Sequence, residues 1–296
     1  MTIKLIHGRA NKPLLGATLA LSAMSLFSVQ DALVKLLAED HSLLQILFLR
    51  SATVVVPLFL FIYFKQGRNG FRTNRKMDHG IRVFYNLAAF ISYYFAITRL
   101  PLATATAIAL SAPLFLTALS GPLLGEPADM KRKCLLVVGF LGVLIVIRPD
   151  FNETDWLGVI AAILGAFMFA MLAIQNRKMS ATEDTNIMVF YGVATFFFLT
   201  GLSMMVFWKT PTITSLIIMV GVGINTFLAQ YCIVHAYKFA AVYTIAPIEY
   251  VVILWALFFG WALFNEYPSW VMLAGCFIIV ISGLVLAFME KWEHEG

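Results

Sequence analysis

The sequence predicts an all-α polytopic membrane protein with ten transmembrane helices, arranged as two inverted five-helix repeats with both termini in the cytoplasm. Three observations predict this fold class. The composition is too apolar for a soluble domain, the chain divides into ten apolar stretches, and its basic residues gather on one side of those stretches.

The composition identifies the solvent. Apolar residues make up 61% of the 296 residues and charged residues 12%, whereas soluble domains contain roughly 45–50% and about 25%. A soluble globule of this size could not remove so much apolar surface from water. Soluble, disordered and disulfide-rich classes are therefore excluded, and a lipid bilayer is the expected partner.

Ten apolar stretches come close to the length of about 20 residues that a membrane-spanning helix needs. They cover roughly residues 14–37, 42–64, 80–98, 101–124, 133–148, 157–176, 186–208, 213–237, 241–264 and 269–289. The fifth is the weakest, because its uncharged run from Cys134 to Ile147 has only 14 residues.

Basic residues are unevenly distributed between the two sides of the membrane when each apolar stretch crosses it and successive loops fall on alternating sides. One side receives sixteen of the 21 Lys and Arg residues, the other receives four, and Arg50 lies within a stretch. Because cytoplasmic loops carry an excess of Lys and Arg, both termini are predicted to be cytoplasmic. Without the fifth stretch this asymmetry would be lost. The net charge of +5 is thus a topology signal, and no nucleic-acid partner is expected.

An internal repeat relates residues 1–148 to residues 149–296. The matches are Thr104 with Thr244 and Glu126 with Glu266 at an offset of 140, and Phe27 with Phe169 and Lys35 with Arg177 at an offset of 142. Each half also has a proline in its fourth stretch, Pro113 and Pro247, which we interpret as hinges. Five is an odd number, so the second half enters the membrane from the opposite face and the repeat is inverted.

Three ionisable residues lie within the apolar stretches, where each costs a few kcal/mol and is a functional candidate. Asp31 and Arg50 are predicted at similar depth on adjacent helices, either as a purely structural pair or as part of a substrate or proton site. Lys35, one turn from Asp31, either extends to the surface or replaces Arg50 as its partner. Glu249 lies near the middle of the membrane, two residues after Pro247, as a candidate for substrate binding or proton coupling.

Several segments together carry a family resemblance. They are Ser28–Lys35, Phe48–Arg50, Leu102–Ala107 with Ala112–Phe115, Gly139–Val143 with Arg148 and Pro149, and Ala246–Tyr250 with Phe264–Pro268. In these segments the chain resembles the ten-helix EamA-type carriers of the drug/metabolite transporter superfamily, and among them the branch with S-adenosylmethionine uptake and riboflavin carriers. The resemblance implies that helices 1–4 and 6–9 line a central cavity and that helices 5 and 10 stand outside it.

Polar residues on the cavity-lining helices complete the candidate site. They are Asn86, Tyr93, Ser111, Asn225, Gln230, Tyr243 and Tyr250. For the tyrosines, an interfacial or packing role is the alternative. Asn225 and Gln230 have the alternative of bonding between helices.

The sequence favours a carrier over other classes of membrane protein. It contains no HExxH, GxSxG or GxxxxGK[ST] motif, so an intramembrane enzyme or an ATP-driven pump is not indicated. An inverted repeat favours alternating access over the fixed pore of a channel. We expect a secondary transporter in the bacterial cytoplasmic membrane for a small polar or zwitterionic metabolite resembling S-adenosylmethionine, riboflavin or an amino acid. It would work with protons or by exchange, without a cofactor or metal, as a monomer or homodimer. The alternative is an exporter of drugs or unrelated metabolites.

Overall fold

The computed structural model describes residues 13–73, 75–124, 130–147, 154–180, 183, 185–239, 245 and 248–295. All regular structure in these ranges is helical. The α-helices are α1 (Pro13–Leu37), α2 (Leu43–Gln66), α3 (Lys76–Arg99), α4 (Leu102–Ala109), α5 (Ala112–Leu124), α6 (Met130–Ile147), α7 (Trp156–Ser180), α8 (Thr185–Phe207), α9 (Ile213–Phe239), α11 (Val251–Phe264) and α12 (Trp270–Glu295), and a short 3-10 helix, η1 (Gly67–Phe71), follows α2.

The described chain contains seven helical segments that are long and apolar enough to cross a membrane, and two shorter apolar helices. The weakest predicted stretch, the fifth, is helical as α6, with three basic residues in its first turn. The part of the chain that the structure describes is thus all-helical in its regular structure and consistent with a polytopic membrane protein.

The fourth predicted span is interrupted. It forms two helices, α4 and α5, separated at Leu110 and Ser111. Pro113 lies in the first turn of α5, and because proline has no backbone N–H it cannot donate to the carbonyl four residues earlier, at Ala109. The bend expected at Pro113 is therefore a break in the helix just before it.

The ninth predicted span, residues 241–264, is described only in part. Its C-terminal portion is α11, preceded by residues 248–250. Pro247 and Tyr243 lie outside the described residues. At its other end α11 stops at Asn265, which has a left-handed backbone with φ of 54°, and the Glu266 amide donates to the Gly260 carbonyl at 3.0 Å. This is a helix C-terminal motif that turns the chain sharply.

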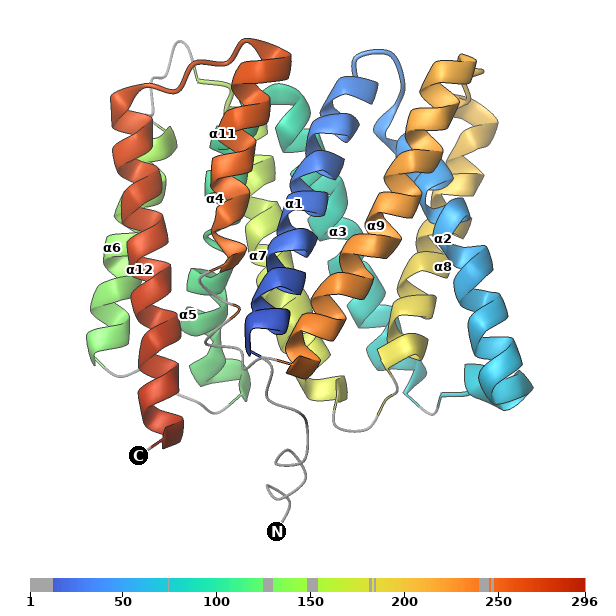
Figure 1. The fold of residues 1–296 in the computed structure, drawn as a ribbon, viewed down its shortest axis with the longest axis horizontal. Coiled ribbons are helices and arrows are strands. Elements are labelled where there is room, and N and C mark those ends of the chain that lie inside the picture. The colour runs from blue at the N-terminus through green and yellow to red at the C-terminus, as the bar shows by residue number, and fades with distance from the viewer. Residues whose placement is uncertain are drawn as a thin grey trace.

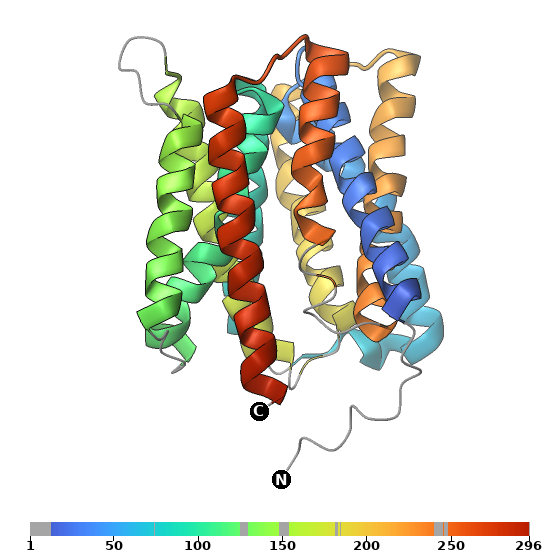
Figure 2. The same ribbon diagram turned by 60° about the vertical axis from the view of Figure 1, so that its left-hand side comes forward.

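The helices form one bundle in which α1 lies between α11 and α9 (Figure 1). The closest helix pairs are α3 with α7, α1 with α9, α6 with α12, and α2 with α8. Figure 2 shows α12 and α6 side by side at one edge of the bundle. The described chain begins with α1 and ends with α12 at the same end of the bundle (Figure 1).

Glycines bring α6 and α12 into close contact. A Cβ atom on Gly275 of α12 would lie 2.9 Å from the Gly142 carbonyl oxygen and from the Val146 backbone nitrogen of α6. Only glycine allows so close an approach of two backbones, as is common between membrane helices.

Candidate functional site

Asp31 is the buried carboxylate of the bundle interior. It lies on α1 with 9% of its surface exposed, and its Oδ2 atom accepts a hydrogen bond from the Tyr93 hydroxyl of α3 at 2.8 Å. The same hydroxyl is 3.4 Å from Thr106 Oγ1 of α4. A carboxylate removed from water needs such partners, because an unpaired buried charge is costly.

A narrow crevice adjoins Asp31. It is lined by Ser28 and Asp31 of α1, Leu102 and Thr106 of α4, and Val252 and Ala256 of α11. The crevice has no room for a water molecule in this conformation. Asp31 thus lines a space where α1, α4 and α11 meet, and this space is too narrow to hold water.

Arg50 lies on α2 and is held by aromatic residues of α3. Its Nη1 atom donates to the Tyr94 hydroxyl at 2.9 Å, and its guanidinium carbon lies 4.8 Å from the centre of the Phe90 ring. Rings at this distance attract a guanidinium group through cation–π interaction. Among the ion pairs of the described residues there is none between Arg50 and Asp31. Instead Asp31 is hydrogen-bonded to Tyr93, and Arg50 is hydrogen-bonded to the adjacent Tyr94.

A glutamine extends this polar network toward the second half of the chain. The side-chain amide of Gln30, next to Asp31 on α1, bonds the Tyr94 hydroxyl through one atom and the Thr226 hydroxyl of α9 through the other. The polar atoms of α2, α3, α1 and α9 are thereby connected in the interior of the bundle. Such networks are strong where every group has a partner.

Lys35 lies in the last turn of α1. Its Nζ atom donates to the Leu100 carbonyl at 2.8 Å and forms an ion pair with Glu266, which follows α11. Of the two expectations for Lys35, the structure has the one in which it extends away from Asp31.

Glu249 and Tyr250 lie immediately before α11. Glu249 is half-buried and Tyr250 is buried. A Cβ atom added to Gly283 of α12 would lie 1.6 Å from the Tyr250 hydroxyl oxygen. Tyr250 therefore packs against α12, and it does not line the crevice beside Asp31.

Four further predicted residues do not line that crevice. Asn86 faces α8, with its amide 3.1 Å from the position of a Cβ atom on Gly192. The Ser111 hydroxyl donates to the Ile108 carbonyl at 2.6 Å, which the break after α4 leaves without its usual helical donor.

Asn225 and Gln230 lie on α9 and differ in their surroundings. Asn225 donates to the Leu26 carbonyl of α1 at 2.6 Å. This is a hydrogen bond between two helices, the alternative role that the sequence predicts for Asn225. Gln230 is exposed. Neither residue lines the crevice.

The site contains residues that the sequence did not single out. Thr106 lies beside the tyrosine that bonds Asp31, and Gln30, Phe90 and Thr226 belong to the group around Arg50 and Tyr94. Gln30 had a signal, because it is an uncharged polar residue beside Asp31 in an apolar stretch. Thr106 and Thr226 had none, since Thr in a membrane helix commonly bonds its own backbone, as both also do here.

Together, the apolar helices and the charged, hydrogen-bonded interior define an integral membrane protein with polar groups positioned between its helices. Comparison with known families identifies it further. The sequence matches the EamA-like transporter family twice, over residues 14–148 and 156–288. The chain belongs to the EamA-like transporter family and is a multi-pass membrane protein of this class.

The chain is similar to proteins with different named activities. It is 26% identical over 270 residues to the S-adenosylmethionine uptake transporter of Rickettsia prowazekii, with 89% of each chain covered. It is 25% identical over 280 residues to the pseudopaline exporter CntI of Pseudomonas aeruginosa, with 93% of this chain and 97% of the relative covered.

A similar fold is found among solved structures. One crystal structure covers 93% of this chain and 97% of its own, with a TM-score of 0.64 and 17% sequence identity. Most of the chain therefore has a fold that occurs in a known structure.

Proposed function

We propose that the protein is a secondary transporter that moves a small polar or zwitterionic metabolite across the bacterial cytoplasmic membrane by alternating access. The observation that carries the proposal is the buried Asp31–Tyr93 hydrogen bond at the crevice between α1, α4 and α11. Both segments that match the family contribute to this crevice, α1 and α4 from the first and α11 from the second. A site between two halves is accessible from alternate sides when the halves rock.

The packing of the helices supports two inverted repeats of five spans each, residues 1–148 and 149–296. Exchanging the halves replaces α1 by α7, α2 by α8, α3 by α9 and α6 by α12. Under this exchange the α1–α9 contact becomes the α7–α3 contact, the α2–α9 contact becomes the α8–α3 contact, and the α6–α12 and α2–α8 contacts map onto themselves. All six contacts are present, as a two-fold relation between the halves requires.

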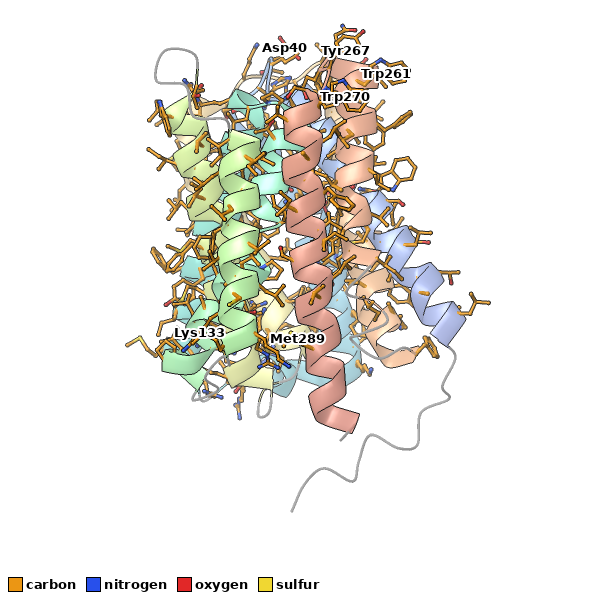
Figure 3. The ribbon with its side chains drawn as sticks, turned by 90° about the vertical axis from the view of Figure 1, so that its left-hand side faces the viewer. Asp40, Lys133, Trp261, Tyr267, Trp270 and Met289 are labelled. Atoms are coloured by element: carbon orange, nitrogen blue, oxygen red, sulfur yellow. The ribbon has the colours of Figure 1, made fainter. Side chains whose placement is uncertain are left out.

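The distribution of charged residues supports cytoplasmic termini, and aromatic residues mark a membrane interface. Trp261, Tyr267 and Trp270 lie at one end of the bundle with Asp40, and Lys133 lies at the other end, where α12 finishes (Figure 3). Lys and Arg mark the cytoplasmic side, and Trp and Tyr favour the membrane interface. We call the end with Asp40 and Tyr267 the outer end.

Opposite charges on two helices suit a zwitterionic substrate. Asp31 would bind a cationic group and Arg50 a carboxylate or other anionic group. Because Asp31 is bonded to Tyr93 and Arg50 to Tyr94, the two side chains do not form an ion pair with each other. Glu249 is proposed as a further substrate- or proton-binding group, half-buried just before α11.

Counterflow in proteoliposomes tests the proposal. Liposomes containing the purified protein are loaded with unlabelled compound, and uptake of labelled S-adenosylmethionine, riboflavin or amino acids is followed with and without a pH gradient. Saturable exchange of one compound supports a carrier and gives its substrate class. Conductance without counterflow would instead indicate a channel.

Variants at the charged residues test the site. We expect Glu249→Gln to reduce counterflow and change its pH dependence, whereas Glu39→Gln, an exposed residue of the loop after α1, leaves both unchanged. If Asp31 and Arg50 only neutralise each other, Asp31→Asn with Arg50→Gln will transport better than either single variant. Losses that add would support separate roles in binding.

Export is the second candidate function, favoured by the similarity to a pseudopaline exporter. An alternating-access carrier is reversible, so the gradients set the direction of net transport. Efflux assays on preloaded vesicles, with amino-acid-derived and unrelated compounds, distinguish this from uptake.

A further inference from the structure

An ion pair joins the two family segments at the outer end of the bundle. Lys35, in the last turn of α1, contacts Glu266, which lies between α11 and α12. Their side chains are only 13% and 20% exposed. The pair is thus shielded from water, unlike most ion pairs on protein surfaces.

Backbone groups at the junction of α3 and α4 complete this contact. Lys35 also donates to the Leu100 carbonyl, and Glu266 Oε2 accepts a hydrogen bond from the Leu102 amide at 2.7 Å. Leu102 is the first residue of α4, so its N–H has no partner within the helix and lies at the positive end of the helix dipole. Glu266 is therefore held by two groups of the first segment.

The chain holds Glu266 in this position from its own side as well. The left-handed Asn265 and the bond from the Glu266 amide to the Gly260 carbonyl fix the turn after α11. Gly260 leaves room for the carboxylate, since a Cβ atom there would lie 2.9 Å from Glu266 Oε2.

Two spaces lie along the seam between α4 and α11, and Glu266 lines one of them. The outer space is a cavity lined by Ala103 of α4, Leu257 and Gly260 of α11, and Glu266 itself, among others. The inner space is the crevice beside Asp31, lined by Leu102 and Ala256, the immediate chain neighbours of Ala103 and Leu257. The Glu266–Leu102 bond thus connects a residue of the outer cavity with a residue of the crevice.

We propose that Lys35 and Glu266, together with the Leu100 carbonyl and the Leu102 amide, form the outer gate of the transporter, and that the cavity outside it is the vestibule through which a polar solute reaches the Asp31 crevice. This inference rests on the proposed transport function. The gate opens when Glu266 leaves Lys35 and the α4 N-terminus, which frees α11 to move away from α4.

Accessibility of a cysteine in the crevice tests the gate. The three native cysteines are replaced by alanine, Ala256→Cys is introduced, and a membrane-impermeant cationic thiol reagent is added to the outer face of spheroplasts. We expect Glu266→Gln and, separately, Lys35→Gln to raise the rate of labelling by about tenfold or more, because each removes an interaction made only in the closed state.

Two controls separate gating from loss of structure. Arg99→Gln breaks a neighbouring ion pair, Arg99–Asp155, which joins the last turn of α3 to the residue before α7 and includes neither Lys35 nor Glu266. It should leave the labelling rate unchanged. Ala166→Cys places the thiol at a fully buried position of α7, and its labelling should stay slow in all backgrounds.

The outcomes decide the proposal without relying on transport. Equal labelling of Ala256→Cys in the parent, Glu266→Gln and Lys35→Gln backgrounds overturns the gate, and so does parallel acceleration at Ala166→Cys, which indicates general loosening. Acceleration at Ala256→Cys alone supports the gate even if no compound shows counterflow, in which case only the proposed transport function fails.

Discussion

The hydrogen bond between Asp31 and Tyr93 makes a quantitative prediction. Tyr93→Phe removes the hydroxyl that donates to Asp31 at 2.8 Å and leaves the ring in place between α1 and α3. Asp31→Asn removes the charge instead. The coupling between the two substitutions measures the interaction itself, because effects that each has elsewhere cancel in a double-mutant cycle.

The magnitude follows from the charge and the burial of Asp31. Hydrogen bonds between membrane helices contribute about 0.6 kcal/mol on average and at most about 1.7 kcal/mol, whereas bonds to charged groups contribute about 1.5–3 kcal/mol. Asp31 is 9% exposed and shares its donor with Thr106 at 3.4 Å. We therefore expect a coupling of about 1.5 kcal/mol, where the two ranges meet.

Unfolding in mixed micelles, titrated with a denaturing detergent, gives the four free energies of the cycle. Tyr94→Phe combined with Asp31→Asn is the matched control, since the Tyr94 hydroxyl bonds Gln30 and Arg50. Its coupling to Asp31 should be smaller. A Tyr93–Asp31 coupling below about 0.6 kcal/mol, or one equal to the Tyr94 value, would refute a charged, hydrogen-bonded Asp31.

Two further predictions concern stability. Gly275→Ala places a methyl group 2.9 Å from backbone atoms of α6 that cannot move aside, so it should lower the free energy of unfolding by about 1–3 kcal/mol. Gly221→Ala is the control, because Gly221 has open space around it, and it should not lower that free energy. Equal losses of stability for the two variants in thermal denaturation would contradict this account. Asp155 accepts a hydrogen bond from the Gly158 amide, and this bond and Arg99 hold the pKa of its carboxyl below the ordinary value. The charge-dependent part of its stabilisation is therefore present above the ordinary carboxyl pKa and lost as the pH falls through the lowered one, so Asp155→Ala should cost about 0.5–1 kcal/mol at neutral pH and less in strong acid. Asp155→Asn keeps an acceptor and should lose less at neutral pH, and a pH-independent deficit would count against the charge.

Much of the fold could be predicted because a bilayer restricts it. Apolar length indicates where helices lie, and the alternation of basic residues predicts a side for each loop. The interruption at Leu110 was only partly predictable. Pro113 indicates a bend in the helix, but the position of the break depends on which backbone carbonyls accept hydrogen bonds from groups outside the regular helical pattern. Ser111 supplies one of these donors to Ile108.

The candidate site was less predictable, because depth in the membrane does not determine direction. Asp31 and Arg50 both lie on helices of the first half, yet each belongs to its own hydrogen-bonded group, Asp31 through Tyr93 and Arg50 through Tyr94. Tyr250 faces α12 and Gln230 is exposed, since helix rotation depends on contacts of the whole helix. The partner of Lys35 lies 231 residues away, and no local spacing indicates it.

The close packing of α6 on α12 provides an internal reference for spectroscopy. Their backbones meet at Gly142 and Gly275, while Val137, Leu141 and Phe277 on the same two helices are exposed to the surroundings. Paired spin labels at Leu141 and Phe277 should keep a constant separation in every state of the transport cycle. Distances from either label to α1 or α11 then report how far each half has moved, on a scale fixed within the same molecule.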